Sequence, residues 1–530
     1  AKVVVTYNSD RSPDEFSLAG KTWTAGRMVT YTLYDEEQNT PIYFDLAAGD
    51  VIINASTYTG YVFEKQGEEF VPVQKTAAHS STNTYYVYQS TEANRGGTMP
   101  PTYSEARYND IPWSEFITNG GKPFGEAVDK DFVETVIEAW DNEEGTQGVA
   151  VNAGRTYTTN NIHVSGNLIC NLTIDNIYSR FSPGPSGSRT GNNTSRTTGG
   201  IGFVPSGNGA KLIINMIGDS RLGCIHYRNG TSDSEVNKKD YSNELVFEGV
   251  GSLTVADADF YKNGGGYYSN HYNSAIGAAD WPNRSGDHSW GIVINSGVVF
   301  AGTTGAENCS AIGGGGNGIG FVTINGGNVT AVATTTGTAI GGGIGFSDMG
   351  GEGYVEINGG NIYAYNFAHS SQIPSAAIGG SGSNASIGNI GNVTITGGNV
   401  YAQTALGTAI GGGSSKTREG GEADVKISGG HVVAKSIASG SVSAGAGIGG
   451  GTGCSGGVQN DASINVDGGR ATINISGNAV VETGSIGGGR SGHVARGKLG
   501  TASINVDGGY TMAQFVMAAG ADDPPTFKMT

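Results

Sequence analysis

Short segments in which apolar and polar residues alternate, each closed by a Gly-Gly pair, recur along the second half of the chain. In 321–333, Val322, Ile324, Val329 and Ala331 alternate with mostly polar neighbours, as expected for strands whose successive side chains point to opposite faces. The same phrase returns at 354–366, 392–404 and 424–436. Amphipathic runs of ten or more residues without glycine are almost absent from this region, which argues against helical repeats.

An Ala-Ile-Gly type of step marks the period of these segments. Successive steps are 28 to 38 residues apart, with their isoleucines at Ile276, Ile312, Ile340, Ile378, Ile410, Ile448 and Ile486. A recurrent period in this range predicts a solenoid. We therefore predict an all-β protein, a right-handed parallel β-helix with three strands per coil, whose inward side chains stack on those of the next coil.

The first part of the chain has a different character. Residues 1–145 hold Trp23, Trp113 and Trp140 and contain fewer Gly-Gly pairs, and the stretch 129–140 has the apolar spacing of a helix. We predict a smaller N-terminal domain over 1–145 that caps the first coil, whose open end would otherwise expose strand edges. Residues 146–530 form the predicted catalytic β-helix.

Composition and charge narrow the function classes. Glycine accounts for 91 of 530 residues, which fits a fold with many tight corners. The formal charge of −17 and the lack of any lysine or arginine cluster exclude nucleic acid as a partner, and no apolar run is long enough for membrane insertion. An acidic Gly/Thr/Asn-rich solenoid is typical of exported proteins, so we expect an extracellular monomer, secreted or anchored at the cell surface.

The four cysteines give no sign of metal or redox chemistry. Cys170, Cys224, Cys309 and Cys454 show no Cys-x-x-Cys spacing, so we interpret them as small buried hydrophobic residues. No cofactor is required by the chemistry proposed below. The acidic stretch 257–260 leaves a structural calcium ion as an option.

The segment 271–290 interrupts the repeats with candidate chemistry. It carries Asp280 and Asp287, seven positions apart, and Pro282 and Gly286 between them can fold the segment back on itself. A pair of carboxylates is the usual machinery of glycoside hydrolysis, one as acid and the other as nucleophile or base. The alternative interpretation is that both are solvated turn residues.

Aromatic and basic side chains near this pair are the candidate sugar contacts. Tryptophan rings can lie against the apolar face of a pyranose, and matching the repeats places 226 and 227 beside 277 and 278 of the next coil. The alternative for the histidine at 226 is that it caps a strand edge. The predicted substrate-binding residues are His226, Tyr227, His271, Tyr272, Trp281, Arg284 and Trp290.

The stretch AADWPNRSGDHSW, on a corner of an Ile-Gly-Gly-rich β-helix, resembles the lacto-N-biosidases of glycoside hydrolase family 136, extracellular enzymes of gut bacteria. The resemblance covers about 210–510. It implies release of lacto-N-biose (Galβ1-3GlcNAc) from lacto-N-tetraose or type 1 mucin glycans with retention, with Asp280 as acid/base and Asp287 as nucleophile. Two other classes stay open: a non-catalytic glycan-binding surface adhesin, and a polysaccharide lyase that would need a base such as Arg284.

Overall fold

The computed structural model consists of strands and connecting turns, with no helix in the parts of the chain that it describes. The described residues are 2–5, 14–17, 41–66, 69–75, 83–90, 107–108, 111–112, 160–179, 200–204, 208–227, 243–256, 274–278, 290–303, 309–316, 318–333, 336–344, 351–366, 373–384, 387–437, 445–453, 466–491, 497–517 and 526–529. The helix predicted at 129–140 lies outside them.

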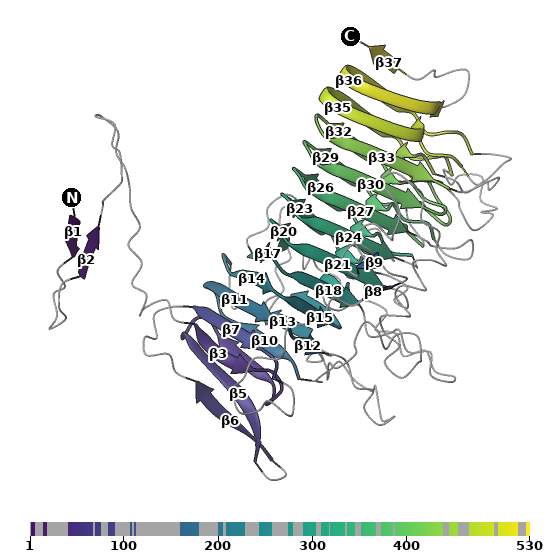
Figure 1. Ribbon diagram of the computed structural model, residues 1–530. Coiled ribbons are helices and arrows are strands. Elements are labelled where there is room, and N and C mark those ends of the chain that lie inside the picture. Colours follow the sequence, from purple (N-terminus) through teal and green to yellow (C-terminus); the bar gives the residue numbers. More distant parts are fainter. Residues whose placement is uncertain are drawn as a thin grey trace. The chain divides into compact units, whose positions relative to one another are not determined.

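Three parallel ladders, each receiving one strand from every full coil, make up a right-handed parallel β-helix (Figure 1). Ladder 1 contains β4 (Val51–Asn54), β10 (Ile162–Ser165), β13 (Gly200–Val204), β16 (Cys224–Tyr227), β19 (Ile276–Ala278), β22 (Ile312–Gly313), β25 (Ile340–Gly341), β28 (Ile378–Gly379), β31 (Ile410–Gly411) and β34 (Ile448–Gly449). The prediction of the fold is confirmed.

Ladders 2 and 3 follow ladder 1 within each coil. Ladder 2 contains β3 (Ile42–Asp45), β7 (Thr84–Tyr88), β11 (Ile169–Asp175), β14 (Lys211–Ile217), β17 (Asn243–Gly249), β20 (Trp290–Ile294), β23 (Gly320–Ile324), β26 (Gly353–Ile357), β29 (Gly391–Ile395) and β32 (Ala423–Ile427). Ladder 3 contains β12 (Tyr178–Ser179), β15 (Asp219–Leu222), β18 (Ser252–Ala256), β21 (Val298–Thr303), β24 (Asn328–Ala333), β27 (Asn361–Asn366), β30 (Asn399–Thr404) and β33 (His431–Ser436).

The last coils contain longer strands. β35 (Ala471–Gly487) and β36 (Ala502–Met517) pass through all three ladders, and β37 (Thr526–Met529) pairs with the ladder 2 part of β36. At the other end, β5 (Thr59–Gln66) pairs antiparallel with β4 and with β6 (Glu69–Lys75). This hairpin covers the free edge of the first ladder 1 strand.

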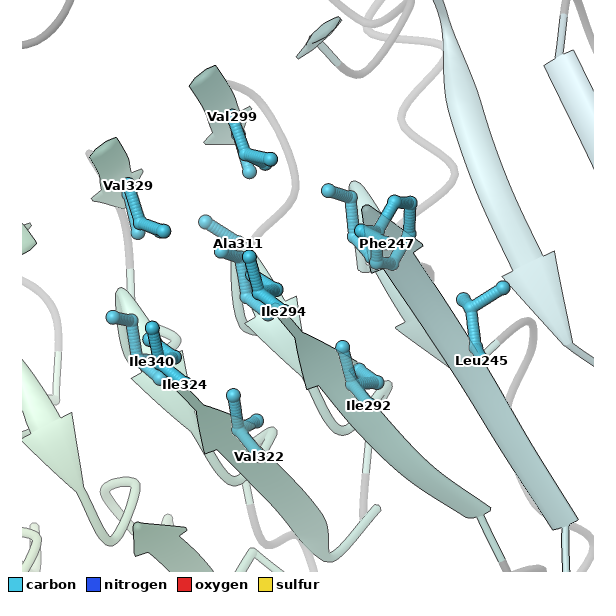
Figure 2. Close-up of a cluster of buried hydrophobic side chains, with 14 of the residues drawn as sticks. Leu245, Phe247, Ile292, Ile294, Val299, Ala311, Val322, Ile324, Val329 and Ile340 are labelled. Carbon is cyan, nitrogen blue, oxygen red and sulfur yellow. The ribbon is translucent and has the colours of Figure 1, made fainter. Parts of the chain in front are cut away.

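The core is a continuous stack of inward side chains. The isoleucines of the predicted step pair in register from Ile276 to Ile486, so the period read from the sequence is the coil period. Figure 2 shows inward residues of consecutive coils, and among them Ile292 and Val322 lie side by side on neighbouring strands. These side chains are buried with nearly no exposed surface, and this supplies the main stabilisation of the stack.

The boundary predicted after residue 145 requires correction. The chain divides into Ala1–Asn39 and Thr40–Thr530. β3, β4 and β7 already join the parallel ladders of the second unit, so 42–88 contributes coils where we expected a separate domain. The first unit contains β1 (Lys2–Val5) paired antiparallel with β2 (Asp14–Ser17). Between β7 and β10, β8 (Arg107–Tyr108) pairs with β9 (Ile111–Pro112).

Glycine packs backbone directly on backbone at the corner between ladders 1 and 2. There each coil runs outward from ladder 1 and returns to ladder 2, and outgoing and returning segments alternate along the axis. The resulting hydrogen-bond chain alternates between them: Gly413 N–H donates to Asn389 O (2.9 Å), Gly421 N–H to Gly413 O (2.7 Å), Gly451 N–H to Gly421 O (2.9 Å) and Gly469 N–H to Gly451 O (2.8 Å). Side chains have no room between these layers. Glycine is therefore needed here for close backbone packing as well as for tight turns.

Candidate functional site

The acid-bearing segment belongs to one corner of the stack, between ladders 1 and 2. Residues 279–289 connect β19 in ladder 1 to β20 in ladder 2. Both ends are fixed, because Ile276 pairs with neighbours on both sides and β20 pairs with β17 and β23. The predicted site residues Asp280, Asp287, Trp281, Arg284, His271 and Tyr272 lie outside the described residues.

A second long segment, 228–242, connects ladder 1 to ladder 2 at the same corner of the preceding coil. Tyr227 is the partner of Ala278, and Asn243 is the partner of Trp290. The stretches 228–242 and 279–289 therefore begin and end on neighbouring strands, about 4.8 Å apart along the axis. In the next coil the same corner contains only 314–319. Later coils have segments of the same length at this corner, namely 342–352, 380–390 and 412–422, and 450–470 is longer. The acidic and tryptophan residues of 279–289, and not its length, therefore distinguish this segment.

The coil register expected from the sequence at this point is confirmed. His226 pairs with Gly277, and Tyr227 with Ala278. Repeat matching therefore places residues correctly along the axis.

Two of the residues predicted to contact sugar point into the core instead of toward solvent. Trp290 is 1% exposed and Tyr227 is 4% exposed, and both belong to the core. Their rings stack with centroids 4.7 Å apart and planes at 16°, and Phe203 packs edge-on against Trp290 at 5.1 Å. As placed, neither ring offers a face to a ligand. The signal was present in the sequence, since Trp290 alternates with Ile292 and therefore points inward with it.

His226 points away from the core but is only 6% exposed. Its Nε2 lies 2.7 Å from the carbonyl oxygen of Ser274, which fixes Nε2 as the donor of that hydrogen bond. Ser274 in turn bonds to Ala278 through its backbone N–H (3.2 Å) and through Oγ (3.1 Å). His226 thus supports the turn that begins β19, which favours a positioning role over the predicted sugar contact.

Among the described residues, no group of three or more His, Cys, Asp or Glu side chains could hold a metal ion. The acidic stretch 257–260, where a calcium ion was an option, lies outside those residues. Cys170, Cys224 and Cys309 are buried, as expected, while Cys454 falls outside the described ranges.

Comparison of the chain with protein-family models, with curated proteins and with solved structures finds no match. Within the described parts of the chain, no helix is long and apolar enough to cross a membrane. The functional argument therefore rests on the fold, on the residues of the acid-bearing segment and on the resemblance noted for 278–290.

Proposed function

We propose that the protein is an extracellular, monomeric, retaining glycoside hydrolase that uses Asp280 and Asp287 to release lacto-N-biose from lacto-N-tetraose or type 1 mucin glycans. The observation that carries this proposal is the pairing of Tyr227 with Ala278 and of Asn243 with Trp290. It brings the ends of the acid-bearing segment beside the ends of 228–242 on neighbouring coils.

A rigid base favours catalysis, since catalytic groups must be held close to their productive geometry. In sequence, Asp280 follows Ala278 by two positions and Asp287 precedes Trp290 by three. Ala278 belongs to a paired strand, and Trp290 is held by Tyr227 and Phe203. Asp280 and Asp287 are therefore only two and three residues, respectively, from backbone that is held in the stack.

The proposed reaction has two steps. Asp280 donates its proton to the leaving oxygen while a carboxylate oxygen of Asp287 attacks the anomeric carbon, so that the glycosidic C–O bond breaks and a glycosyl ester forms. Water, deprotonated by Asp280, then attacks the same carbon and releases Asp287 as a carboxylate. Two inversions at this carbon give net retention.

The test measures disaccharide released from lacto-N-tetraose by the unmodified chain, by Asp280→Asn and by Asp287→Asn. Asp424→Asn is the matched control, because Asp424 is a surface carboxylate paired with Lys426 at 2.9 Å on the outside of ladder 2. We expect each site variant to lose about 10²-fold to 10⁴-fold in rate, and the control to keep full activity. The first product observed by NMR should be the β-anomer.

Other products would point to the other classes. Glycan binding without any released disaccharide would replace the hydrolase with a surface adhesin. An unsaturated product that requires calcium would indicate a lyase, and equal activity of Asp287→Asn and the unmodified chain would contradict the assigned nucleophile.

A further inference from the structure

A pair of tyrosine rings lies on the outward face of ladder 2, on its first two strands, β3 and β7 (Figure 1). Phe44 and Val87 of these strands face the core, so Tyr43 and Tyr86 beside them point outward. The two tyrosines are register partners, and their ring centroids lie 5.1 Å apart with the planes at 37°. Tyr43 is 52% exposed. The face therefore presents an aromatic surface to solvent.

The ring that supports Tyr43 is held in place by the next coil. The Tyr86 hydroxyl donates a hydrogen bond to the carboxylate of Asp175, and the Asn176 side-chain amide donates to the same carboxylate at 2.7 Å. Burial and the hydrogen bond to Asp175 raise the pKa of Tyr86, so its hydroxyl stays a donor at neutral pH. An aromatic surface that is fixed before binding loses little freedom when a ligand covers it.

Uncharged polar side chains continue from the rings along the axis. The register row of Tyr43 and Tyr86 runs on through Thr173 and Asn215, with one residue per coil at a spacing of about 4.8 Å. Asn171, in the neighbouring outward row of the same coil as Thr173, is exposed. Hydroxyl and amide groups both donate and accept hydrogen bonds. The face thus combines a ring surface with neutral hydrogen-bonding groups.

The charges of this face favour a neutral ligand. In the described strands β3, β7, β11 and β14, its one cation is Lys211, which pairs with Glu244 at 2.6 Å, while the carboxylates of Asp45 and Asp175 would repel an anion. Asp175 is 3% exposed, and Asp45 accepts the backbone N–H and the hydroxyl of Ser90, so both carboxylates are engaged within the protein.

Pyranose sugars match this combination of groups. The C–H side of a pyranose is apolar and lies flat against an aromatic ring, while its hydroxyls can exchange hydrogen bonds with amide and hydroxyl side chains. The row from Tyr43 to Asn215 spans three coil steps, or about 14 Å at ~4.8 Å per coil. That length suits an oligosaccharide better than a single sugar.

We propose that the outward face of ladder 2 from Tyr43 to Asn215 is a non-catalytic binding surface for neutral oligosaccharides, with one pyranose ring stacked on Tyr43. Hydroxyls of the following sugars bond to Asn171, Thr173 and Asn215. The acid-bearing segment joins β20, which follows β3 in ladder 2 after β7, β11, β14 and β17, about 24 Å along the axis. The surface is therefore separate from the proposed catalytic pair, and the inference stands whether or not the chain hydrolyses glycans.

Binding is tested on an array of neutral and anionic oligosaccharides that includes lacto-N-tetraose. The full chain carries Asp287→Asn, so that hydrolysis does not consume the glycans, and release of disaccharide by the unmodified chain is measured separately. Neutral glycans are expected to bind, and adding Tyr43→Ala should weaken their binding about tenfold, whereas Tyr43→Phe keeps the ring and should keep binding. Tyr510→Ala is the matched control, because Tyr510 is 59% exposed in β36, at the other end of the stack.

Two results on the array would overturn the proposal. In the first, no neutral glycan binds, or anionic glycans bind in preference. In the second, every glycan that binds does so equally well to the chain with Tyr43→Ala.

Hydroxyl-radical footprinting adds a measurement that does not depend on a substitution at the surface. A neutral glycan that binds on the array, added at saturating concentration, should lower the oxidation of Tyr43 and leave that of Tyr510 unchanged. Hydrogen exchange of 84–88 shows whether the Tyr43 variants keep the first coils folded, as expected. If a variant opens these coils, the footprint of the chain with native Tyr43 decides, and unchanged oxidation of Tyr43 with bound glycan would refute the inference.

Discussion

Adding one methyl group inside the glycine layer should separate neighbouring coils. Gly413→Ala places a Cβ 1.7 Å from the carbonyl oxygen of Ser381, although the backbone conformation of Gly413 suits an L-residue. Carbon and oxygen cannot approach much closer than 3 Å, so the layers must move apart by more than 1 Å at a point held by the 2.9 Å and 2.7 Å hydrogen bonds of Gly413.

The expected cost follows from the two consequences of that movement. Overpacking of a tight interior costs about 1 to 3 kcal/mol, and each buried backbone group left without its partner costs about 1 to 3 kcal/mol more. We therefore expect Gly413→Ala to lower the free energy of unfolding of its coils by about 3 kcal/mol or more. Since each coil contacts only its neighbours, the loss should concentrate around 380–453.

Three matched variants separate crowding from backbone strain. Gly411→Ala combines both, with φ of +138° and a Cβ 2.0 Å from Gly449 O, and should be the most destabilising. Gly209→Ala has φ of +85° and nothing within 4 Å, so it should cost only the strain, about 1 to 2 kcal/mol. Gly484→Ala has neither problem and should be neutral or stabilise by about 0.5 to 1 kcal/mol.

Hydrogen exchange measured peptide by peptide is the suitable assay, because a long solenoid does not have to unfold in one cooperative step. Faster exchange in 380–453 for Gly413→Ala, with normal exchange in the first coils, is the expected pattern. If Gly413→Ala exchanged like Gly484→Ala, the backbone contacts between the layers would not exist as described.

Further predictions concern the core, a histidine and the thiols. Trp290→Ala should cost about 3 to 5 kcal/mol in a denaturant titration, whereas Tyr510→Ala, at a 59% exposed position, should change little; equal effects would contradict the inward placement of Trp290. Burial lowers the pKa of His163, and the Asp50 carboxylate opposes this shift only in part, so the unfolded chain binds the proton more readily and stability should fall as pH drops below about 6.5. His163→Gln should make that pH dependence shallower. Burial raises the pKa of the Cys170 thiol, so iodoacetamide should modify it only after unfolding, and modification of the native chain would show that this coil opens.

Local pattern was sufficient to predict the repeat. Alternation with a period of two and the recurring Ala-Ile-Gly step depend on neighbouring residues alone, and the stack then follows because identical steps pair in register, as Ile312 does with Ile340. The same matching placed His226 beside Gly277 correctly. The acid pair at 280 and 287 was found from sequence as a departure from the repeat, and its chemistry stays a prediction.

Burial on the outside of the stack and contact between corners depend on segments distant in sequence, and only the tertiary structure decided them. Trp290 resembled a surface ring because it follows the acid-bearing segment, yet it packs on Tyr227 from the preceding coil. The glycines read as turn residues also separate interleaved backbones, and the outward rings of ladder 3 are buried by a layer that strand alternation cannot reveal. Sequence determined the period and the inward stack because these are local; what covers each face depends on where the rest of the chain folds.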